Sequence, residues 1–390
     1  MQYTANPDGI KPLLRQLARQ CGFSALGFAP PTAPAHADAL LPWLAAGHHG
    51  DMAWLARDPQ RRMDPAALMP GLGVVLVLGI NHRPAFDPLA RLRDPGAMSV
   101  AAYAQGQDYH EPVKKRLKEL ARALTRHWGA PLDGRVFVDT APLLERPVAA
   151  GSALGWQGRN TMLVSRTFGC WLTLGEYFLP LPLTPDTPHR HHCGDCRRCV
   201  DICPTGALDQ PFQLAGERCL AFLTNESHGA IPRSLRRVLG NRVFGCDDCV
   251  AVCPFNRFAP VTTDAVFTPR PLLEQPRLVD FARLDEARFA TMFRHHPIKR
   301  LGLDRFGRNL AVALGNQARS GTDSPGAVAA LGHLLTCGGP LSRAHAAWGL
   351  GEVARGCQQA WALLWQQRHR EENGEVQQEI VAALEPVEQP

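Results

Sequence analysis

Two short cysteine runs in the middle third of the chain are the strongest constraint on its fold. The first run, Cys193 to Pro204, has the spacing Cys-x2-Cys-x2-Cys-x3-Cys-Pro, and the second, Cys246 to Pro254, repeats this shape with one cysteine missing. In bacterial ferredoxins of this spacing, three thiolates of a run hold one 4Fe-4S cluster and the fourth reaches a second cluster. The chain is therefore predicted to hold two 4Fe-4S clusters.

Two clusters need four thiolate ligands each, and Cys219 supplies the cysteine that the second run lacks. The first predicted ligand set is Cys193, Cys196, Cys199 and Cys253, and the second is Cys203, Cys219, Cys246 and Cys249. Zinc is the usual alternative for clustered cysteines, but zinc has no redox chemistry, whereas crossed runs place two cubanes close enough for electron transfer. The remaining cysteines, at positions 21, 170, 337 and 357, stand alone and are interpreted as buried apolar side chains without a function.

Length and charge narrow the class of protein further. A chain of 390 residues with 45% hydrophobic residues has material for two or three globular domains. The net charge of +6 and pI near 8.8 permit a polyanionic partner without requiring one. Residues 1–28 contain no long apolar run and no twin-arginine signal, so we expect a cytoplasmic protein, not bound to a membrane, with reduced cysteines.

The apolar pattern predicts a mixed α/β region before the cysteine runs. Helices are expected at residues 11–21 and 114–128, and strands at residues 73–78, 135–138, 161–165 and 170–174. A proline-rich stretch, residues 180–188, should break regular structure. We therefore expect an α/β N-terminal domain over residues 1–185 and a ferredoxin-like two-cluster domain over residues 186–262.

The last part of the chain, residues 263–390, is expected to be α-helical. Residues 308–315, 343–352 and 376–384 are similar to one another and lie about 35 residues apart. Such a period is typical of stacked helix pairs in HEAT-like repeats. An ordinary helical bundle is the alternative, and the overall fold class is a multidomain α+β protein.

The catalytic chemistry must lie outside the clusters, which only carry electrons. The first 180 residues contain no Gly-x-Gly-x-x-Gly or Gly-Lys-Ser/Thr phosphate loop. Asp108-Tyr109-His110 begins like a cobalamin-ligating Asp-x-His-x-x-Gly motif, but Val113 replaces the glycine. Asp139 follows a predicted strand, where its carboxylate could either reach into a crevice or cap the next helix, and position alone does not decide between the two.

Several motifs together resemble one known family. They are Val138-Asp-Thr-Ala-Pro-Leu-Leu-Glu-Arg, Gly155-Trp-Gln-Gly-Arg-Asn-Thr-Met-Leu163, Leu174-Gly-Glu-Tyr-Phe178, both cysteine runs, Leu223-Thr-Asn-Glu-Ser-His-Gly-Ala-Ile-Pro232 and Arg308-Asn-Leu-Ala-Val-Ala-Leu-Gly-Asn316. This set, which extends over nearly the whole chain, resembles the epoxyqueuosine reductases. Gln157 and Arg159 stand where that family usually has Ile and Lys, and Phe255 stands for a Trp.

The resemblance implies a cobalamin-dependent enzyme that reduces epoxyqueuosine, at the wobble position of tRNA, to queuosine. It implies cobalt without a protein histidine ligand, an external electron donor and, we expect, a monomer. Asp139 is the residue that the family pattern nominates to protonate the epoxide oxygen. We expect burial near the corrin to raise the pKa of Asp139, so that its proton is available near neutral pH.

The resemblance also nominates residues that contact the cofactor and the RNA. The candidate cofactor-binding residues are Arg57, Tyr103, Asp139, Gly158, Arg159, Asn160, Thr161 and Asp247, and Asp108, Tyr109 and His110 could line the same pocket. The candidate tRNA contacts are Thr224, Arg233, Arg236, Arg300 and Arg308. A reductive dehalogenase and a ferredoxin-like electron carrier are the competing classes of protein.

Overall fold

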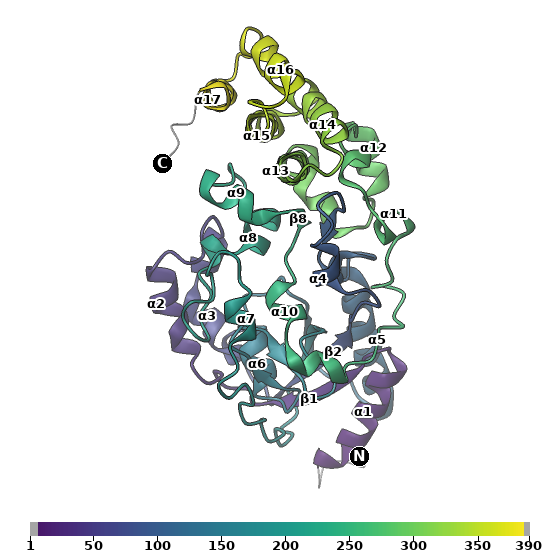
Figure 1. Cartoon of the computed structure of the whole chain (residues 1–390). Helices are drawn as coiled ribbons and strands as arrows, with labels where there is room; N and C mark the ends of the chain where they lie inside the picture. The colour runs from purple at the N-terminus through teal and green to yellow at the C-terminus, as the bar shows by residue number, and fades with distance from the viewer. Residues whose placement is uncertain (1–6, 386–390) are drawn as a thin grey trace. The chain divides into compact units, whose positions relative to one another are not determined.

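The structure is a computed structural model that describes residues 7–385, and it divides into two compact units. Unit 1 comprises residues 1–85, 108–217 and 248–268, and unit 2 comprises residues 86–107, 218–247 and 269–390. Both units contain helices, and the largest sheet lies in unit 1 (Figure 1). The predicted domain boundaries near residues 185 and 262 stay predictions.

A four-stranded antiparallel sheet forms the centre of unit 1. Its order is β1 (Ala25–Ala29), β2 (Val74–Asn81), β7 (Leu172–Leu179) and β4 (Arg135–Phe137). Every residue of β2 and β7 is buried, as expected for central strands that are covered on both faces and read as continuous apolar runs.

Helices cover both faces of this sheet because alternate side chains of each strand point to opposite sides. Leu76 and Leu78 of β2 pack in one cluster with α1 (Lys11–Gln20) and α5 (His110–Trp128). Val75 and Val77 pack in a second cluster that includes α6 (Glu145–Ala150). The short helices α2 (Leu40–Ala45) and α3 (Pro59–Met63) complete the N-terminal part of the unit.

The prediction of a mixed α/β region is confirmed, although its sheet is wholly antiparallel. The predicted helices correspond to α1 and α5, and residues 180–188 contain no helix or strand. The strand predicted at 161–165 is shorter than expected: β6 (Leu163–Val164) pairs with β5 (Trp156–Gln157) as a two-residue hairpin. The cysteine runs contribute two one-turn helices that contact each other, α7 (Arg198–Asp201) and α10 (Asp248–Ala251).

Unit 2 is mainly helical. A parallel pair of short strands, β3 (Ser99–Val100) and β8 (Arg242–Phe244), lies in this unit. Its helices are α4 (Pro88–Arg91), α8 (Leu220–Asn225), α9 (Arg233–Leu239), α11 (Pro271–Glu274), α12 (Glu286–Met292), α13 (Gly302–Ser320), α14 (Ser324–Cys337), α15 (Pro340–Gly351), α16 (Gln358–Arg368) and α17 (Gly374–Leu384). Among residues 7–385, no helix is long and apolar enough to cross a membrane.

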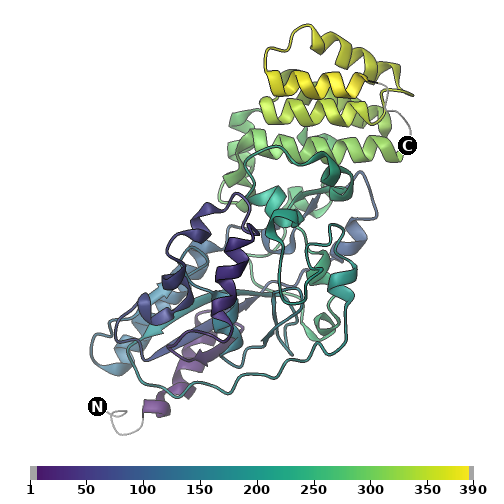
Figure 2. The ribbon, with the colours of Figure 1, turned by 90° about the vertical axis from the view of Figure 1, so that its left-hand side faces the viewer.

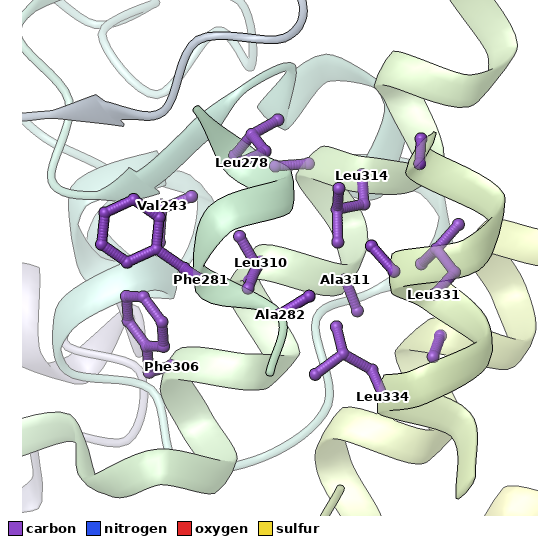
Figure 3. Packing of buried hydrophobic residues seen from close by; sticks show 14 of the residues in the cluster. Val243, Leu278, Phe281, Ala282, Phe306, Leu310, Ala311, Leu314, Leu331 and Leu334 are labelled. Carbon is purple, nitrogen blue, oxygen red and sulfur yellow. The ribbon is translucent and has the colours of Figure 1, made fainter. Parts of the chain in front are cut away.

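The five C-terminal helices pack in two rows (Figure 2). Helices α13, α15 and α17 contact in sequence, while α14 contacts α16 behind them. Helices α13 and α15 approach each other closely where Gly315 faces Gly349, since a Cβ on Gly315 would come within 2.7 Å of the Gly349 backbone. Leu310, Leu314 and Leu331 fill the core beside this contact (Figure 3).

Arg308 of α13 is a buried cation at the centre of unit 2, with no solvent-exposed surface. Its guanidinium donates hydrogen bonds to the backbone carbonyls of Ser227 (2.9 Å), Gly229 (2.6 Å) and Leu223 (2.7 Å), and to the Asn309 side chain (3.0 Å). A buried charge is tolerated when hydrogen bonds replace its lost hydration. Arg308 therefore joins α13 to the loop after α8.

Replacing Arg308 with Ala is expected to lower the free energy of unfolding by about 3 kcal/mol or more, because each buried carbonyl left without a donor costs about 1–3 kcal/mol. Chemical denaturation followed by circular dichroism measures the change. Arg319→Ala on the same helix is the matched control: this side chain is half-exposed and should cost less than about 1 kcal/mol. Equal denaturation midpoints for the two variants would contradict a bracing role for Arg308.

Candidate active site and metal centre

The structure brings together the four side chains that were predicted to hold the first cluster. Cys199, on α7, lies close enough to Cys193, Cys253 and Cys196 for their charges to affect it. Burial, followed by these neighbouring thiols, raises the pKa of Cys199 to about 11. The raised pKa means that ionising the Cys199 thiol costs free energy. Positively charged iron offsets this cost, because it binds the thiolate form. The four thiols therefore suit a cluster, and their exact role as ligands stays a prediction.

The thiols are not arranged for a single metal ion. Across residues 7–385, no three His, Cys, Asp or Glu side chains converge on a position that could hold one metal. A cubane distributes four thiolates over four irons, so its ligands stand farther apart than the ligands of zinc.

The second predicted ligand set divides between the two units. Cys203 and Cys249 belong to unit 1, whereas Cys219 and Cys246 belong to unit 2. All four are half-buried, and none of them forms a disulfide. This ligand set stays a prediction.

Asp139 lies at the centre of a hydrogen-bonded polar cluster in unit 1. Its Oδ2 accepts hydrogen bonds from the Tyr109 hydroxyl (3.0 Å) and from His110 Nε2 (3.2 Å). The other ring nitrogen of His110 contacts Asp108 Oδ1 at 2.6 Å, and the rings of Tyr109 and His110 stack. The motif that begins like a cobalamin-ligating sequence thus positions Asp139.

Asp139 lies in the loop between a strand and a helix, in an uncommon backbone conformation. The residue follows β4 and precedes α6, and its φ of +54° is uncommon for a residue with a side chain. Its backbone N–H donates a hydrogen bond to Glu145 Oε1 at 2.5 Å, and the N-cap residue of α6 is Leu144, so Asp139 does not cap this helix. The Asp139 side chain is 53% exposed, compared with 24% for His110, so Asp139 is the member of the cluster that a ligand can reach.

The expectation of a raised pKa for Asp139 is wrong in this structure. The hydrogen bond from His110 lowers the pKa of Asp139, and this effect outweighs burial. Burial alone would lower the pKa of His110, but its hydrogen bonds to Asp108 and Asp139 outweigh burial and raise it to about 9. Near neutral pH the proton therefore resides on His110, and Asp139 is ionised.

Sequence reasoning missed one buried and one half-buried carboxyl beside this cluster. Glu176 of β7 pairs with Phe137 of β4, two residues before Asp139, and is completely buried. Burial, followed by the Glu145 charge, raises the pKa of Glu176 well above its usual range, so Glu176 is protonated at neutral pH. Burial and the Asp139 charge raise the pKa of Glu145 to about 7. A lone carboxylate within the apolar run of β7 was the available sequence signal.

The candidate cofactor residues at 158–161 form a tight turn that backbone hydrogen bonds hold together. The N–H of Gly158 donates to the Met162 carbonyl, and the N–H of Thr161, with φ of +60°, donates to the Gly158 carbonyl. Arg159 donates to the carbonyl of Gly194, beside the first cluster ligand. The turn thus holds the cysteine run, and its role as a cobalamin contact stays a prediction.

The Asn160 side chain also contacts the cluster region. Its amide donates to the Cys249 carbonyl at 2.9 Å and lies 3.7 Å from the sulfur of Cys170. Cys170 therefore lies near the predicted ligands. From the sequence alone it was assigned no function.

Three further cofactor candidates lie elsewhere. Arg57 of unit 1 is exposed at the end of a 3₁₀ turn. In unit 2, the Tyr103 hydroxyl accepts a hydrogen bond from Asn225 (3.0 Å), and Asp247 Oδ2 accepts one from the Ala102 N–H (2.7 Å). These contacts are internal to unit 2, and a role in cofactor binding stays a prediction for all three.

Three of the five candidate tRNA contacts are buried in unit 2. Thr224 is 0%, Arg236 2% and Arg308 0% exposed, so a phosphate cannot reach them in this structure. Helix-surface arginines cannot be separated by sequence from arginines that brace a core. Arg233 and Arg300, in contrast, have side chains that are 49% and 42% exposed.

Comparison with known proteins defines the class first. Residues 192–256 match the family model for a 4Fe-4S double cluster binding domain, which supports the prediction of two iron–sulfur clusters. Residues 62–140 match the family model described as Epoxyqueuosine reductase QueG, DUF1730. The chain therefore combines an iron–sulfur electron-transfer module with a region typical of one group of reductases.

Similar proteins then identify the family. The chain is 41% identical over 349 residues to an epoxyqueuosine reductase of Xanthomonas campestris pv. campestris, covering 89% of this chain and 97% of that protein. It is 39% identical over 353 residues to an epoxyqueuosine reductase of Alicycliphilus denitrificans, covering 88% and 98%. The chain belongs to the epoxyqueuosine reductase family.

Solved structures agree with this relationship. A crystal structure of epoxyqueuosine reductase with an epoxyqueuosine-modified tRNA-Tyr stem loop matches with a TM-score of 0.85 at 26% identity, covering 96% of this chain and 98% of that one. An epoxyqueuosine reductase from Bacillus subtilis, whose catalytic aspartate loop is swung out of the active site, matches with a TM-score of 0.84 at the same identity and coverage.

The Cys253→Ala variant should lose the first cluster, because it removes one of four thiolates. Iron content after anaerobic reconstitution is expected to fall from about eight to about four atoms per chain, as two cubanes become one. Cys357→Ala, which removes a half-buried cysteine outside the runs, should keep all the iron. A Cys253→Ala protein with unchanged iron and an unchanged electron paramagnetic resonance spectrum would exclude this ligand.

Proposed function

We propose that this chain reduces epoxyqueuosine in tRNA to queuosine, with two 4Fe-4S clusters, cobalamin and an external electron donor. The observation that carries the proposal is that unit 1 contains both a gathered set of cluster cysteines and a separate proton-storing pair, Asp139 and His110. The family relationship and the tRNA stem loop bound to the similar structure support it.

The Asp139 cluster fits a cobalamin whose cobalt has no protein histidine ligand. Both ring nitrogens of His110 are engaged by carboxylates, one by Asp108 and one by Asp139, so neither is available to cobalt. When bound, cobalamin would supply the two electrons of the reduction at its cobalt. Asp139, Arg57, Tyr103, Asp247 and the turn at residues 158–161 are the proposed contacts.

Reduction of the epoxide consumes two electrons and two protons and releases the oxygen as water. A strained C–O bond breaks readily only if the departing oxygen is protonated. Asp139 is reachable from solvent and His110 stores the proton, so we infer that Asp139 receives a proton from His110 and passes it to the oxygen.

The second proton requires another store. Glu145 lies one hydrogen bond from the Asp139 backbone, and its pKa of about 7 makes it half-protonated near neutral pH. The protonated Glu176 stands next to it as a further reserve. We therefore assign Glu145 and Glu176 to proton supply.

The tRNA would be held by charged groups on unit 2. Arg233 and Arg300 are the exposed candidates for phosphate contacts, whereas the buried Thr224, Arg236 and Arg308 would shape the surface from beneath. The packing of α13 to α17 in two rows supports the HEAT-like repeat interpretation, which provides a broad surface for a macromolecule.

The test of this function is direct conversion. The reconstituted chain, supplied with cobalamin and a chemical reductant, should convert an epoxyqueuosine-containing tRNA stem loop to queuosine, seen by mass spectrometry as the loss of one oxygen. Asp139→Asn should abolish conversion, by about 100-fold or more, while cluster and corrin absorption persist. Asp133→Asn, at an exposed position six residues earlier, should retain full activity. An active Asp139→Asn enzyme would remove Asp139 from the role of proton donor.

The reaction rate should depend on the protonation of His110. Because the pKa of His110 is raised to about 9, the imidazolium is present below that pH and is lost as the pH rises through it. Single-turnover rates should show a limb that falls tenfold per unit above about pH 9, separate from any change near pH 7, where Glu145 titrates. His110→Gln should be slower and lack this limb, whereas His127→Gln, exposed on the same helix, should keep it. A wild-type rate that still rises above pH 9 would contradict this assignment.

A further inference from the structure

We propose that Trp156 and Cys170, two side chains outside the cysteine runs, set the reduction potential of the first cluster through hydrogen bonds to its ligand sulfurs, and that Asn160 orients Cys170. This inference rests on the iron–sulfur domain and does not depend on the identity of the substrate. It concerns residues of unit 1 alone.

Trp156 is positioned to donate to the sulfur of Cys193. Its indole Nε1 lies 3.4 Å from Cys193 Sγ, a normal distance for a nitrogen donor and a sulfur acceptor. The ring is 3% exposed and is held edge-on by two residues next to predicted ligands, His192 (4.9 Å between ring centroids) and Phe255 (4.8 Å). An indole has a donor and no acceptor, so Cys193 must be the acceptor.

We assign the Cys170 thiol as a donor to the sulfur of Cys253. Its side chain is 1% exposed and lies close enough to Cys253 for the charge of that thiolate to affect it. An iron-bound cysteine carries no proton, so in the loaded protein only the Cys170 thiol can supply the hydrogen. The backbone N–H of Cys170 donates to Asn256 Oδ1 at 3.0 Å, which fixes Cys170 relative to the residues after Cys253.

Asn160 orients the Cys170 thiol. Its amide nitrogen lies 3.7 Å from Cys170 Sγ and donates to the Cys249 carbonyl at 2.9 Å. The sulfur of Cys170 therefore accepts from Asn160, which leaves the thiol hydrogen of Cys170 for another acceptor. In the proposal this acceptor is the sulfur of Cys253, a predicted cluster ligand.

These bonds favour the reduced cluster for an electrostatic reason. Reduction adds one negative charge to a cluster that already bears four thiolates, and the added charge resides partly on the sulfurs. A hydrogen bond to a ligand sulfur stabilises this charge and raises the reduction potential, as outer-shell donors do at metal sites generally. Burial acts in the opposite direction, so the donors offset the cost of placing the cluster among apolar side chains.

The experiment measures the potential of the first cluster in the full-length, reconstituted chain without substrate. Trp156→Phe removes the N–H and keeps an aromatic ring, so the ratio of reduced to oxidised first cluster at a fixed potential should fall about tenfold. That change corresponds to a shift of about 59 mV toward negative potential for a one-electron couple. Titrations followed by electron paramagnetic resonance report it, with Cys253→Ala giving the reference spectrum of the other cluster.

The control is Trp43→Phe. The Trp43 indole donates to a backbone carbonyl, that of Leu214, at 2.7 Å and not to sulfur, so its loss should leave the potential unchanged. Equal shifts in the two tryptophan variants would show a general effect of the substitution and would overturn the role of Trp156.

The paired variants Cys170→Ala and Cys170→Ser test the second bond. Ala removes the donor and should shift the potential in the negative direction, whereas Ser retains a donor and should restore most of it. Both variants leave the predicted ligands intact, so their iron content should match the wild type. Full iron with an unchanged potential in both Trp156→Phe and Cys170→Ala would overturn the proposal.

A measurement on the unaltered protein covers the case in which a variant loses iron. Electron–nuclear double resonance of the reduced first cluster should show exchangeable protons, which disappear in deuterated buffer, coupled to the cluster. Absence of such protons would contradict the proposal regardless of how the variants behave.

Discussion

Gathering four thiols in a protein interior is the constraint on which the rest of unit 1 depends. The thiolates repel one another and lose hydration, and the raised pKa of Cys199 expresses that cost. Iron offsets it, so cluster binding and folding of the segment from Cys193 to Cys253 are coupled. Helices α7 and α10 are too short to be stable alone, and each contacts the other.

The antiparallel sheet supplies the rigid part of the same unit. Strand β7 pairs with β4 in a register that sets Glu176 against Phe137, and β4 ends just before Asp139. The end of β4 therefore places the Asp139 carboxylate where Tyr109 and His110, at the start of α5, can hydrogen-bond to it. A low-propensity backbone conformation at Asp139 is held by its contacts to Glu145, Tyr109 and His110.

The electrostatics of this cluster follow from proximity more than from burial. An isolated, buried carboxyl would be protonated, which holds for Glu176. Asp139 differs because a histidine cation bonds it, so the acidic proton moves to His110 while the carboxylate faces outward. In the proposed function, protons therefore come from this cluster of unit 1, whereas electrons come from the separate cysteine runs.

The sequence by itself determined the two-cluster module, the α/β character and the family, because ligand spacing and apolar periodicity are local properties of the chain. It also singled out Asp139 and the Asp108–His110 segment. Only the tertiary structure decided that Asp139 is ionised, that Glu145 and Glu176 stand near it, and that Cys170 and Trp156 lie near predicted cluster ligands. It likewise showed Arg236 and Arg308 to be buried. These properties depend on which distant groups become neighbours and on how much water they retain, and neither is encoded in the spacing of residues along the chain.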